Sequence, residues 1–248
     1  MSGHSKWSTI KHKKGAADAR RGKLFTKLAK EITIAAREGG GDPDFNNRLR
    51  LAIAKAKADN MPNDNIDRAI KRGTGELEGG ELYEIMYEAY APHGVGMLIE
   101  VVTDNRNRAV ADVRHVFNKF GGSLAENGAV AWQFTRKGYI TIEEEVDEDE
   151  LFLIAADAGA EDVQFGEVTE VYTEIENFQA VQKAIEDAGI TIDEAKMIYE
   201  PNNMIELAQP QTLQVMGVIE KVEDLDDVQN VYTALDIDDE AIAVMESA

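Results

Sequence analysis

The sequence predicts an α+β multidomain protein: a three-helix domain at the N-terminus, then two α/β domains of the ferredoxin-like type, one inserted in the other. Three observations lead to this fold class. The chain has 248 residues, more than one domain usually holds. Apolar residues recur at helical spacing up to about residue 80, and beyond it β-rich runs alternate with helical periods. The order β-α-β-β-α-β over residues 139–199 is that of the ferredoxin-like fold.

Three amphipathic helices account for the first domain, residues 1–80. The first helix is predicted from residue 23 to the glycine run at 39–41, with an apolar face of Leu24, Leu28, Ile32 and Ala35. The second helix follows Asp42-Pro43 and turns inward Leu49, Ala52, Ile53 and Ala56. Pro62 suits the first turn of the third helix, because the N–H that proline lacks has no partner there. The inner face of that helix is Ile66, Ala69 and Ile70.

Residues 81–135 predict strands at 83–90, 95–103 and 129–134 and a helix at about 106–120. This set, β-β-α-β, lacks a second covering helix. A helix at 213–222 and a strand at 228–235 remain near the C-terminus and cannot form a domain by themselves. We therefore predict one discontinuous middle domain made of residues 81–135 and 205–248.

Residues 136–204 are predicted to form the inserted ferredoxin-like domain. Its strands are expected at 139–142, 163–165, 168–172 and 191–199. Its two helices are indicated by apolar faces, Leu151, Ile154, Ala155 and Ala158 in the first and Phe178, Val181, Ile185 and Ala188 in the second. Pro201-Asn202-Asn203 marks the exit from this domain.

Composition excludes several classes of protein. The chain has no cysteines, which excludes a disulfide scaffold, thiolate zinc sites, iron–sulfur ligation and a cysteine nucleophile. No apolar run approaches the roughly 20 residues of a membrane span, and the N-terminus lacks the apolar segment of a signal peptide. We therefore expect a cytoplasmic protein with no membrane partner.

Charge is divided unevenly along the chain. Residues 1–80 hold 17 basic and 10 acidic side chains, a net of +7, whereas residues 81–248 hold 9 and 37, a net of −28. A basic part favours contact with a polyanion, and an acidic body repels one. The alternative is a basic surface that has no partner.

The candidate nucleic-acid contacts are basic side chains and one aromatic ring. In the N-terminal tail they are Lys6, Trp7, Lys11, Lys13, Lys14, Arg20 and Arg21. The cations suit phosphates, and Trp7 suits stacking on a base. On the first helix, almost opposite its apolar face, they are Lys23, Lys27, Lys30 and Arg37. No base-reading pattern accompanies them, so no sequence specificity is predicted.

Arg106 and Arg108 form a basic island in the acidic half, where a strand leads into a helix. The unpaired N–H groups and the dipole of a helix N-terminus favour a phosphate site there. Arginine also serves ion pairs within a protein. The alternative is therefore that these two residues pair with nearby carboxylates or bridge two domains.

No catalytic constellation is evident. His4, His12, His93 and His115 lack the placed partners of a nucleophilic triad or a zinc site. No phosphate-binding glycine loop follows a strand. The acidic run at 143–150 lacks the spacing of a calcium loop and is typical of a solvated loop that precedes a helix. We therefore expect no enzyme activity, no cofactor, no metal site and no small-molecule substrate.

Several motifs resemble the YebC/PmpR family. They are MSGHSKW at residues 1–7 and the segments 10–14, 21–23, 25–27, 36–43, 60–62, 70–75, 103–108 and 130–132. The resemblance runs from residue 1 to about residue 235 and implies an N-terminal helical domain followed by two α/β domains, one inserted in the other. It transfers no catalytic residue. His93 departs from the pattern, since the family more often has Gly there.

The resemblance implies two kinds of function. Bacterial members are described as probable transcriptional regulators that bind DNA and have also been tied to the ribosome, and a mitochondrial relative is a translational activator of a cytochrome oxidase subunit. We predict a non-enzymatic regulator of gene expression that binds nucleic acid, specifically a DNA-binding transcriptional regulator. The alternatives are a translation factor associated with RNA or the ribosome and, third, a protein–protein adaptor built on the acidic domains. A monomer is favoured.

Overall fold

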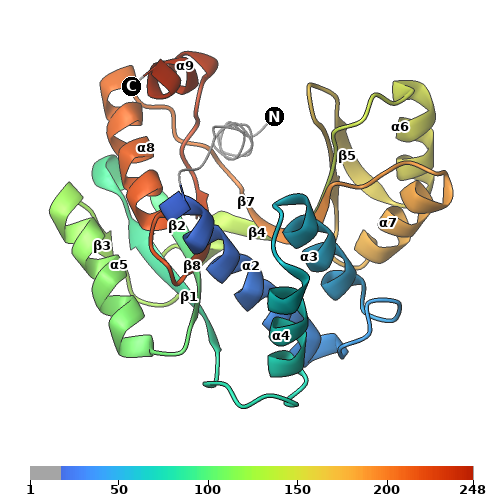
Figure 1. Cartoon of the computed structure of the whole chain (residues 1–248). Helices are drawn as coiled ribbons and strands as arrows, with labels where there is room; N and C mark the ends of the chain where they lie inside the picture. The colour runs from blue at the N-terminus through green and yellow to red at the C-terminus, as the bar shows by residue number, and fades with distance from the viewer. Residues whose placement is uncertain (1–17, 248) are drawn as a thin grey trace.

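The computed structural model describes residues 18–247. It contains two four-stranded sheets, in the orders β3-β1-β2-β8 and β5-β6-β4-β7. Strand β8, near the C-terminus, returns to the first sheet after the chain has completed the second, so one α/β unit is inserted in the other. Figure 1 shows the N-terminal helices lying between the two α/β units. The predicted fold class is confirmed.

The N-terminal helical unit consists of α2 (Asp18–Gly39), α3 (Asn47–Ala58) and α4 (Asn63–Gly73). Buried Asn46 joins the first two helices. Its side-chain oxygen accepts the Leu49 N–H at the start of α3, and its amide donates to the carbonyl of Ala35 in α2. The unit has a core of its own, made of Leu28, Ile32, Ala35, Ala36, Leu49, Ala52, Ala56, Met61, Ile66 and Ala69.

The middle unit is built on the first sheet. Its strands are β1 (Tyr83–Tyr90), β2 (Gly96–Thr103), β3 (Ser123–Leu124) and β8 (Val228–Thr233). Strands β1 and β2 pair antiparallel along their whole length, and β2 also pairs antiparallel with β8. Helices α5 (Arg106–Phe120), α8 (Gln209–Glu223) and α9 (Asp239–Ser247) complete this unit. The prediction includes neither the short strand β3 nor helix α9.

The inserted unit has the β-α-β-β-α-β order of the prediction. Its strands are β4 (Phe134–Ile142), β5 (Ala160–Gln164), β6 (Thr169–Thr173) and β7 (Glu194–Pro201), and its helices are α6 (Glu148–Asp157) and α7 (Phe178–Asp187). The helices pack on one face of the sheet, over a core of Ile140, Ile142, Leu151, Ala155, Val171, Val181 and Ile185.

The strand predicted at 129–134 is wrong. Residues Ala131–Gln133 form a 3-10 turn, and β4 begins only at Phe134. The physical reason is a buried carboxylate, Glu88, that accepts the backbone N–H groups of Gly128, Val130 and Ala131 at 2.5, 2.6 and 2.8 Å. These N–H groups are therefore not available to pair with another strand.

Several predicted element ends also moved: β4 begins at Phe134 rather than at 139, β5 and β7 are each displaced by a few residues, and β8 ends at Thr233 rather than at 235. Helix α2 begins at Asp18 rather than at residue 23. The prediction began too late because the first turn of the helix precedes its apolar face and carries no periodic signal. Helix α8 begins at Gln209 rather than at 213, with Pro210 in its first turn. The limits predicted for the three domains, 1–80, 81–135 with 205–248, and 136–204, stay a prediction, and we propose them as the units of the chain.

Contacts between the units hold the three parts together. The two sheets share a small core of Leu98, Val130, Phe134, Tyr232 and Ala234, with Ile198 and Tyr199 packed against it. Helix α3 contacts the inserted unit through polar pairs: Asn47 with Gln182 at 2.7 Å, Arg50 with Glu186 at 2.8 Å, and Lys55 with Glu194. Helix α2 contacts the middle unit, and the predicted site residues Lys23, Lys27, Lys30 and Arg37 lie at that contact.

Candidate nucleic-acid interface

The predicted tail contacts lie outside the described residues. They are Lys6, Trp7, Lys11, Lys13 and Lys14. Arg20 and Arg21 belong to the first turn of α2, where the side chain of Arg21 is exposed. The structure therefore gives a side-chain environment for Lys23, Lys27, Lys30, Arg37, Arg106 and Arg108.

The basic stripe of α2 contacts the segment that follows helix α8. The Nζ atom of Lys23 donates to the carbonyl oxygen of Asp224 at 3.0 Å, and that of Lys27 donates to the last carbonyl of α8 at 2.6 Å. Lys30 donates to the carbonyl oxygen of Asp226 at 2.9 Å. The paired residues are 196 to 201 positions apart in the sequence, so only the tertiary fold brings them together.

Helix electrostatics explain why Lys23 and Lys27 meet the end of α8, whereas the acceptors of Lys30 are Asp226 and Asp227 in the loop that follows. The last carbonyls of a helix have no partner within it and carry partial negative charge, which favours a cation. Lys23, Lys27 and Lys30 are spaced i, i+4 and i+7, so all three lie on one face of α2. They hold the helical unit on the middle unit, and a phosphate contact by them stays a prediction.

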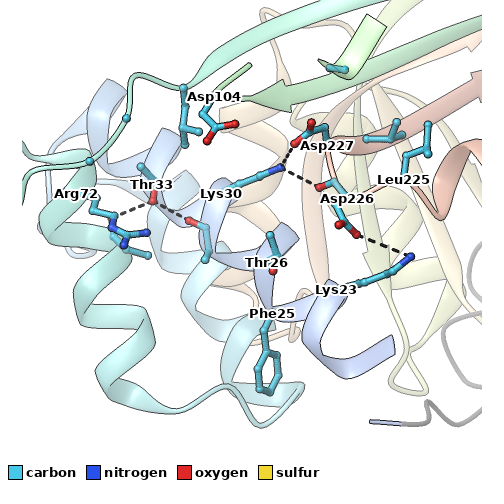
Figure 2. Close-up of a pocket in the computed structure, with 18 of the residues that line it drawn as sticks. Lys23, Phe25, Thr26, Lys30, Thr33, Arg72, Asp104, Leu225, Asp226 and Asp227 are labelled. Carbon is cyan, nitrogen blue, oxygen red and sulfur yellow. Dashed lines mark hydrogen bonds and ion pairs between the residues drawn. The ribbon is translucent and has the colours of Figure 1, made fainter. Parts of the chain in front are cut away.

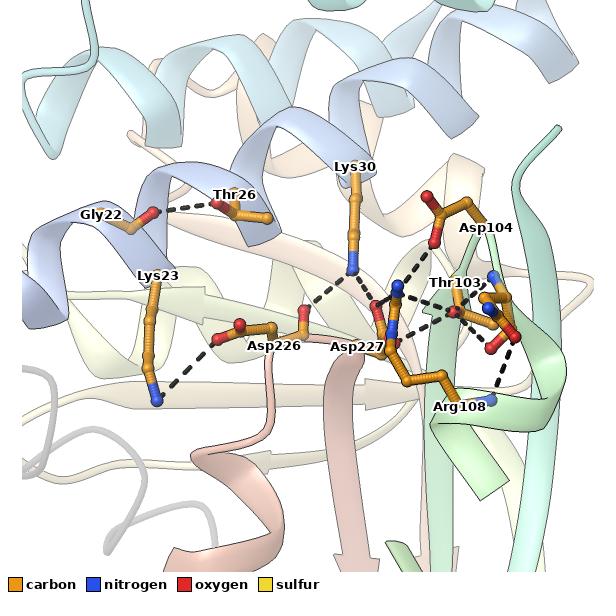
Figure 3. Close-up of polar contacts among 10 residues, drawn as sticks. Gly22, Lys23, Thr26, Lys30, Thr103, Asp104, Arg108, Asp226 and Asp227 are labelled. Atoms are coloured by element: carbon orange, nitrogen blue, oxygen red, sulfur yellow. Dashed lines mark hydrogen bonds and ion pairs between the residues drawn. The ribbon is translucent and has the colours of Figure 1, made fainter. Parts of the chain in front are cut away.

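Asp227 is the centre of a nearly buried network of charges (Figure 3). Its side chain is 9% exposed, and that of Lys30 is 14% exposed. The Nζ atom of Lys30 lies 2.7 Å from Oδ1, and Nη2 of Arg108 lies 2.9 Å from Oδ2. The Thr103 hydroxyl donates to Oδ2 at 3.0 Å. The network therefore joins α2, β2, α5 and the loop before β8.

The two cations keep Asp227 ionised. Burial by itself would raise the pKa of this carboxyl, but the hydrogen bonds from Lys30 and Arg108 outweigh burial and hold the pKa below its ordinary value. The carboxylate is therefore charged at neutral pH, and the link between the two units is electrostatic.

Both arginines of the basic island have partners within the chain. Arg108 pairs with Asp227 and also with Asp104 at 2.8 Å. The guanidinium carbon of Arg106 lies 3.9 Å from the centre of the Tyr83 ring, a cation–π contact. Arg108 thus takes part in the network around Asp227, which joins the helical unit to the middle unit. This is the bridging role expected from the sequence as the alternative to a phosphate site. Both side chains are also exposed, and their contact with phosphate stays a prediction.

Arg37 ties the end of α2 to the first strand of the middle unit. Its guanidinium donates to the carbonyl oxygen of Leu82 at 2.7 Å and to Oε1 of Glu84 at 2.8 Å. The Arg37 and Glu84 side chains are 41% and 32% exposed. This pair adds little to stability by itself, but it orients the C-terminal half of α2.

A cleft of about 1220 Å³ lies where α2 and α4 face the middle unit (Figure 2). One wall carries the basic residues Lys23, Lys30, Arg37, Arg68 and Arg72, and the opposite wall carries Asp104, Asp112, Asp224, Asp226 and Asp227 together with Arg108. The lysines on the α2 side already meet acidic or carbonyl partners across the cleft. The arginines of α4 have no such partner among residues 18–247.

Arg68, Lys71 and Arg72 on α4 are exposed and form no ion pair with any other residue of the described range 18–247. They lie on the second half of the helix, where the dipole favours cations. The sequence places them on the outer face of the third helix, but they were not among the predicted contacts. What distinguishes them from the α2 cations is the lack of a partner, and a sequence pattern does not show partners.

His93 has a structural environment. It has a positive φ of 66°, and its Nε2 atom lies 2.9 Å from Oε1 of Gln214 in α8. A positive φ favours glycine, which accounts for the residue that the resembling family more often has there. Across residues 18–247, no group of three or more His, Cys, Asp or Glu side chains could hold a metal ion. In the same range, no helix has both the length and the apolar character of a membrane span.

The fold and the contacts between its units define a class of protein. It is an α+β protein whose basic helical unit is docked on two acidic α/β units. Two family models match the chain, the TACO1/YebC protein N-terminal domain over residues 5–76 and the TACO1/YebC second and third domain over residues 82–235. The chain belongs to the TACO1/YebC family. The resemblance seen in the sequence is confirmed.

Relatives match along nearly the full chain. A protein of Desulfatibacillum aliphaticivorans named "probable transcriptional regulatory protein" is 57% identical over 244 residues, 98% of this chain and 99% of the relative. A protein of Dehalococcoides mccartyi with the same description is 53% identical, over 98% and 97% of the two chains. The crystal structure of a conserved hypothetical protein from Aquifex aeolicus matches with a TM-score of 0.84 and 47% identity, over 93% and 96% of the two chains.

Proposed function

We propose that this protein is a regulator of gene expression that binds nucleic acid, with DNA as its target and without a catalytic step. The description shared by the relatives supports a regulatory role. The net charge of +7 on residues 1–80, against −28 on the remainder, supports contact through the N-terminal part. Phosphates attract this part, and the acidic units repel them.

The observation that carries the proposal is the unpaired positive charge on α4. Arg68, Lys71 and Arg72 are exposed and have no carboxylate partner in the described part of the chain, whereas the α2 lysines have partners on the middle unit. A cation without an internal partner can neutralise a phosphate without first breaking an ion pair. The face of α4 that carries these three cations is therefore the phosphate-binding surface that we propose, with Arg68 and Arg72 at the cleft.

Two further groups of residues complete the proposed interface. The first adds phosphate contacts and base stacking from the N-terminal side: Lys6, Trp7, Lys11, Lys13, Lys14, Arg20 and Arg21. The second orients the helical unit and adds positive potential beside α4: Lys23, Lys27, Lys30, Arg37, Arg106 and Arg108. The second group stays among the proposed phosphate contacts, although its members also have partners within the chain.

Replacing Arg68, Lys71 and Arg72 together by Gln is expected to weaken binding to duplex DNA and to flatten its salt dependence. Each phosphate contact contributes about −0.9 to the slope of log affinity against log salt. Loss of three contacts should therefore reduce the slope by roughly 2–3, about equally for all sequences. Fluorescence anisotropy with labelled duplexes, titrated between about 50 and 200 mM salt, measures this slope.

The matched control removes three positive charges from the acidic units: Arg114, Lys119 and Arg136, all exposed, each replaced by Gln. This variant has the same change in net charge, and its salt slope should stay near that of the native protein. An equal loss in both variants would show that total charge, rather than the face of α4, governs binding.

The tail is expected to act in two ways. Replacing Lys13 and Lys14 by Gln should flatten the salt slope by roughly 1–2 and weaken all sequences about equally. Trp7→Ala should cost about 1–3 kcal/mol with single-stranded targets and leave the slope unchanged, because stacking involves no counterion release. The same anisotropy titrations test both. If the lysine pair affected only one sequence, with an unchanged slope, direct base recognition would replace this account.

Crosslinking in growing cells, with sequencing of the attached nucleic acid, tests the choice of target. Recovery of discrete promoter fragments would support DNA. Rich recovery of ribosomal RNA would refute DNA as the target and support the translation factor instead. The variant with Arg68, Lys71 and Arg72 replaced by Gln gives the background of non-specific crosslinking. It should fail to recover the nucleic acid that the native protein binds specifically.

A further inference from the structure

An exposed apolar pair lies on the outer face of helix α6. Phe152 and Leu153 are 50% and 63% exposed, although they are adjacent in a helix. The inner face of that helix is already filled, because Leu151 and Ala155 are fully buried in the core of the inserted unit. The pair therefore contributes nothing to this core, and its exposure to water is unfavourable.

Acidic side chains surround the pair. Residues three and four positions apart are neighbours on a helix surface. By that spacing the neighbours of Phe152 and Leu153 are Glu148, Asp149, Glu150 and Asp157, all of them exposed. In the described part of the chain, none of these four carboxylates forms an ion pair with a lysine or arginine. We call these six residues the α6 patch.

We propose that the α6 patch binds a polypeptide segment that is rich in lysine and arginine and presents apolar side chains. Large exposed apolar side chains within a polar rim are typical of interaction sites, and a buried aromatic or aliphatic anchor contributes most of the affinity at such sites. The unpaired carboxylates add electrostatic complementarity, which speeds association and selects the partner.

Charge also excludes the other classes of occupant. Nucleic acid and anionic lipid surfaces carry the same sign as the patch and are repelled. A second copy of the chain placed face to face would bring the two sets of carboxylates together, which is unfavourable for the same reason. A cationic polypeptide is the macromolecule that satisfies both the apolar pair and its rim.

The α6 patch is separate from the proposed nucleic-acid surface. Helices α6 and α4 lie apart in the molecule, α6 at the outer end of the inserted unit and α4 at the opposite edge of the helical unit (Figure 1). A basic polypeptide and a nucleic acid can therefore be bound at the same time. The inference does not depend on the proposed function.

The test uses the full chain and two labelled synthetic peptides. One is amphipathic, with lysines on one helical face and leucines on the other, and the second has every leucine replaced by serine, so that only the apolar face is lost. The variant is F152S/L153S, which keeps all charges. The control is L77S/M204S, which removes two other exposed apolar side chains, 41% and 40% exposed. Binding is measured by fluorescence anisotropy, and the melting temperature confirms folding.

The native chain should bind the lysine–leucine peptide, and F152S/L153S should bind it on the order of tenfold more weakly. The control should match the native chain, and the lysine–serine peptide should bind weakly to all three proteins. Replacing Asp149 and Glu150 by Asn and Gln should weaken binding and reduce its salt dependence.

The proposal is overturned if the native chain does not bind the lysine–leucine peptide, or if F152S/L153S binds it equally well. Equal binding of both peptides, or a self-association that F152S/L153S abolishes, would also overturn it.

Discussion

Asp227→Asn is expected to lower the free energy of unfolding by about 3 kcal/mol, near the lower end of the range for removing one partner of a buried ion pair. The substitution leaves Lys30, 14% exposed, without its carboxylate. Arg108 keeps Asp104 as a partner, which limits the loss. For a chain of this size the melting temperature should fall by roughly 6–12 °C. Thermal denaturation followed by circular dichroism measures the change.

The matched control is Asp224→Asn, because the side chain of Asp224 is exposed and its backbone carbonyl still accepts from Lys23. This variant should melt within a degree or two of the native protein, as surface substitutions usually do. Equal melting temperatures for Asp227→Asn and the native protein would show that the network does not hold the two units together.

The contribution of Asp227 also predicts a pH dependence. Because its pKa is lower in the folded than in the unfolded state, its stabilisation is fully present above the unfolded value of about 3.9 and is lost as the pH falls through the folded pKa. The stability difference between native protein and Asp227→Asn should therefore be constant near neutral pH and shrink below about pH 4. A difference that grew on acidification would contradict the network.

Glu88→Gln is expected to cost about 3 kcal/mol, because hydrogen bonds to a charged group contribute about 1.5–3 kcal/mol each. The amide oxygen can still accept the N–H groups of Val130 and Ala131, but the amide nitrogen would then face the N–H of Gly128. Two donors would then point at each other, and the side-chain amide at the buried position 88 would have no acceptor there. Burial alone would raise the pKa of Glu88, and the three N–H groups outweigh burial and lower the pKa, so the carboxylate is charged at neutral pH.

Trp132 reports on this loop, since its Nε1 atom donates to the carbonyl of Ala129 at 2.9 Å. In a Trp7→Phe background its fluorescence should show increased mobility in Glu88→Gln, in addition to the lowered melting temperature. Glu126→Gln is the control, because the Glu126 side chain is exposed in the same loop. Unchanged Trp132 fluorescence and melting in Glu88→Gln would show that the carboxylate does not organise the loop.

Elements whose signals are local could be predicted from neighbouring residues. Helix α5 was predicted at about 106–120 and spans Arg106–Phe120, because its apolar period and the glycines that follow it are adjacent in the chain. Strand β1 matches its predicted range for the same reason. The β-α-β-β-α-β order and the family motifs are also properties of contiguous residues, and both were confirmed.

Which cations have partners depends on contacts between distant segments of the chain. The spacing of Lys23, Lys27 and Lys30 shows a basic face, but the acceptors on that face come from a segment almost 200 residues later, and no local pattern encodes such a contact. The strand expected at 129–134 was wrong for the same reason, since a single carboxylate more than 40 residues earlier takes up its N–H groups. Local propensity sets which elements can form; hydrogen bonds and charges between distant segments decide which side chains remain free to bind a partner.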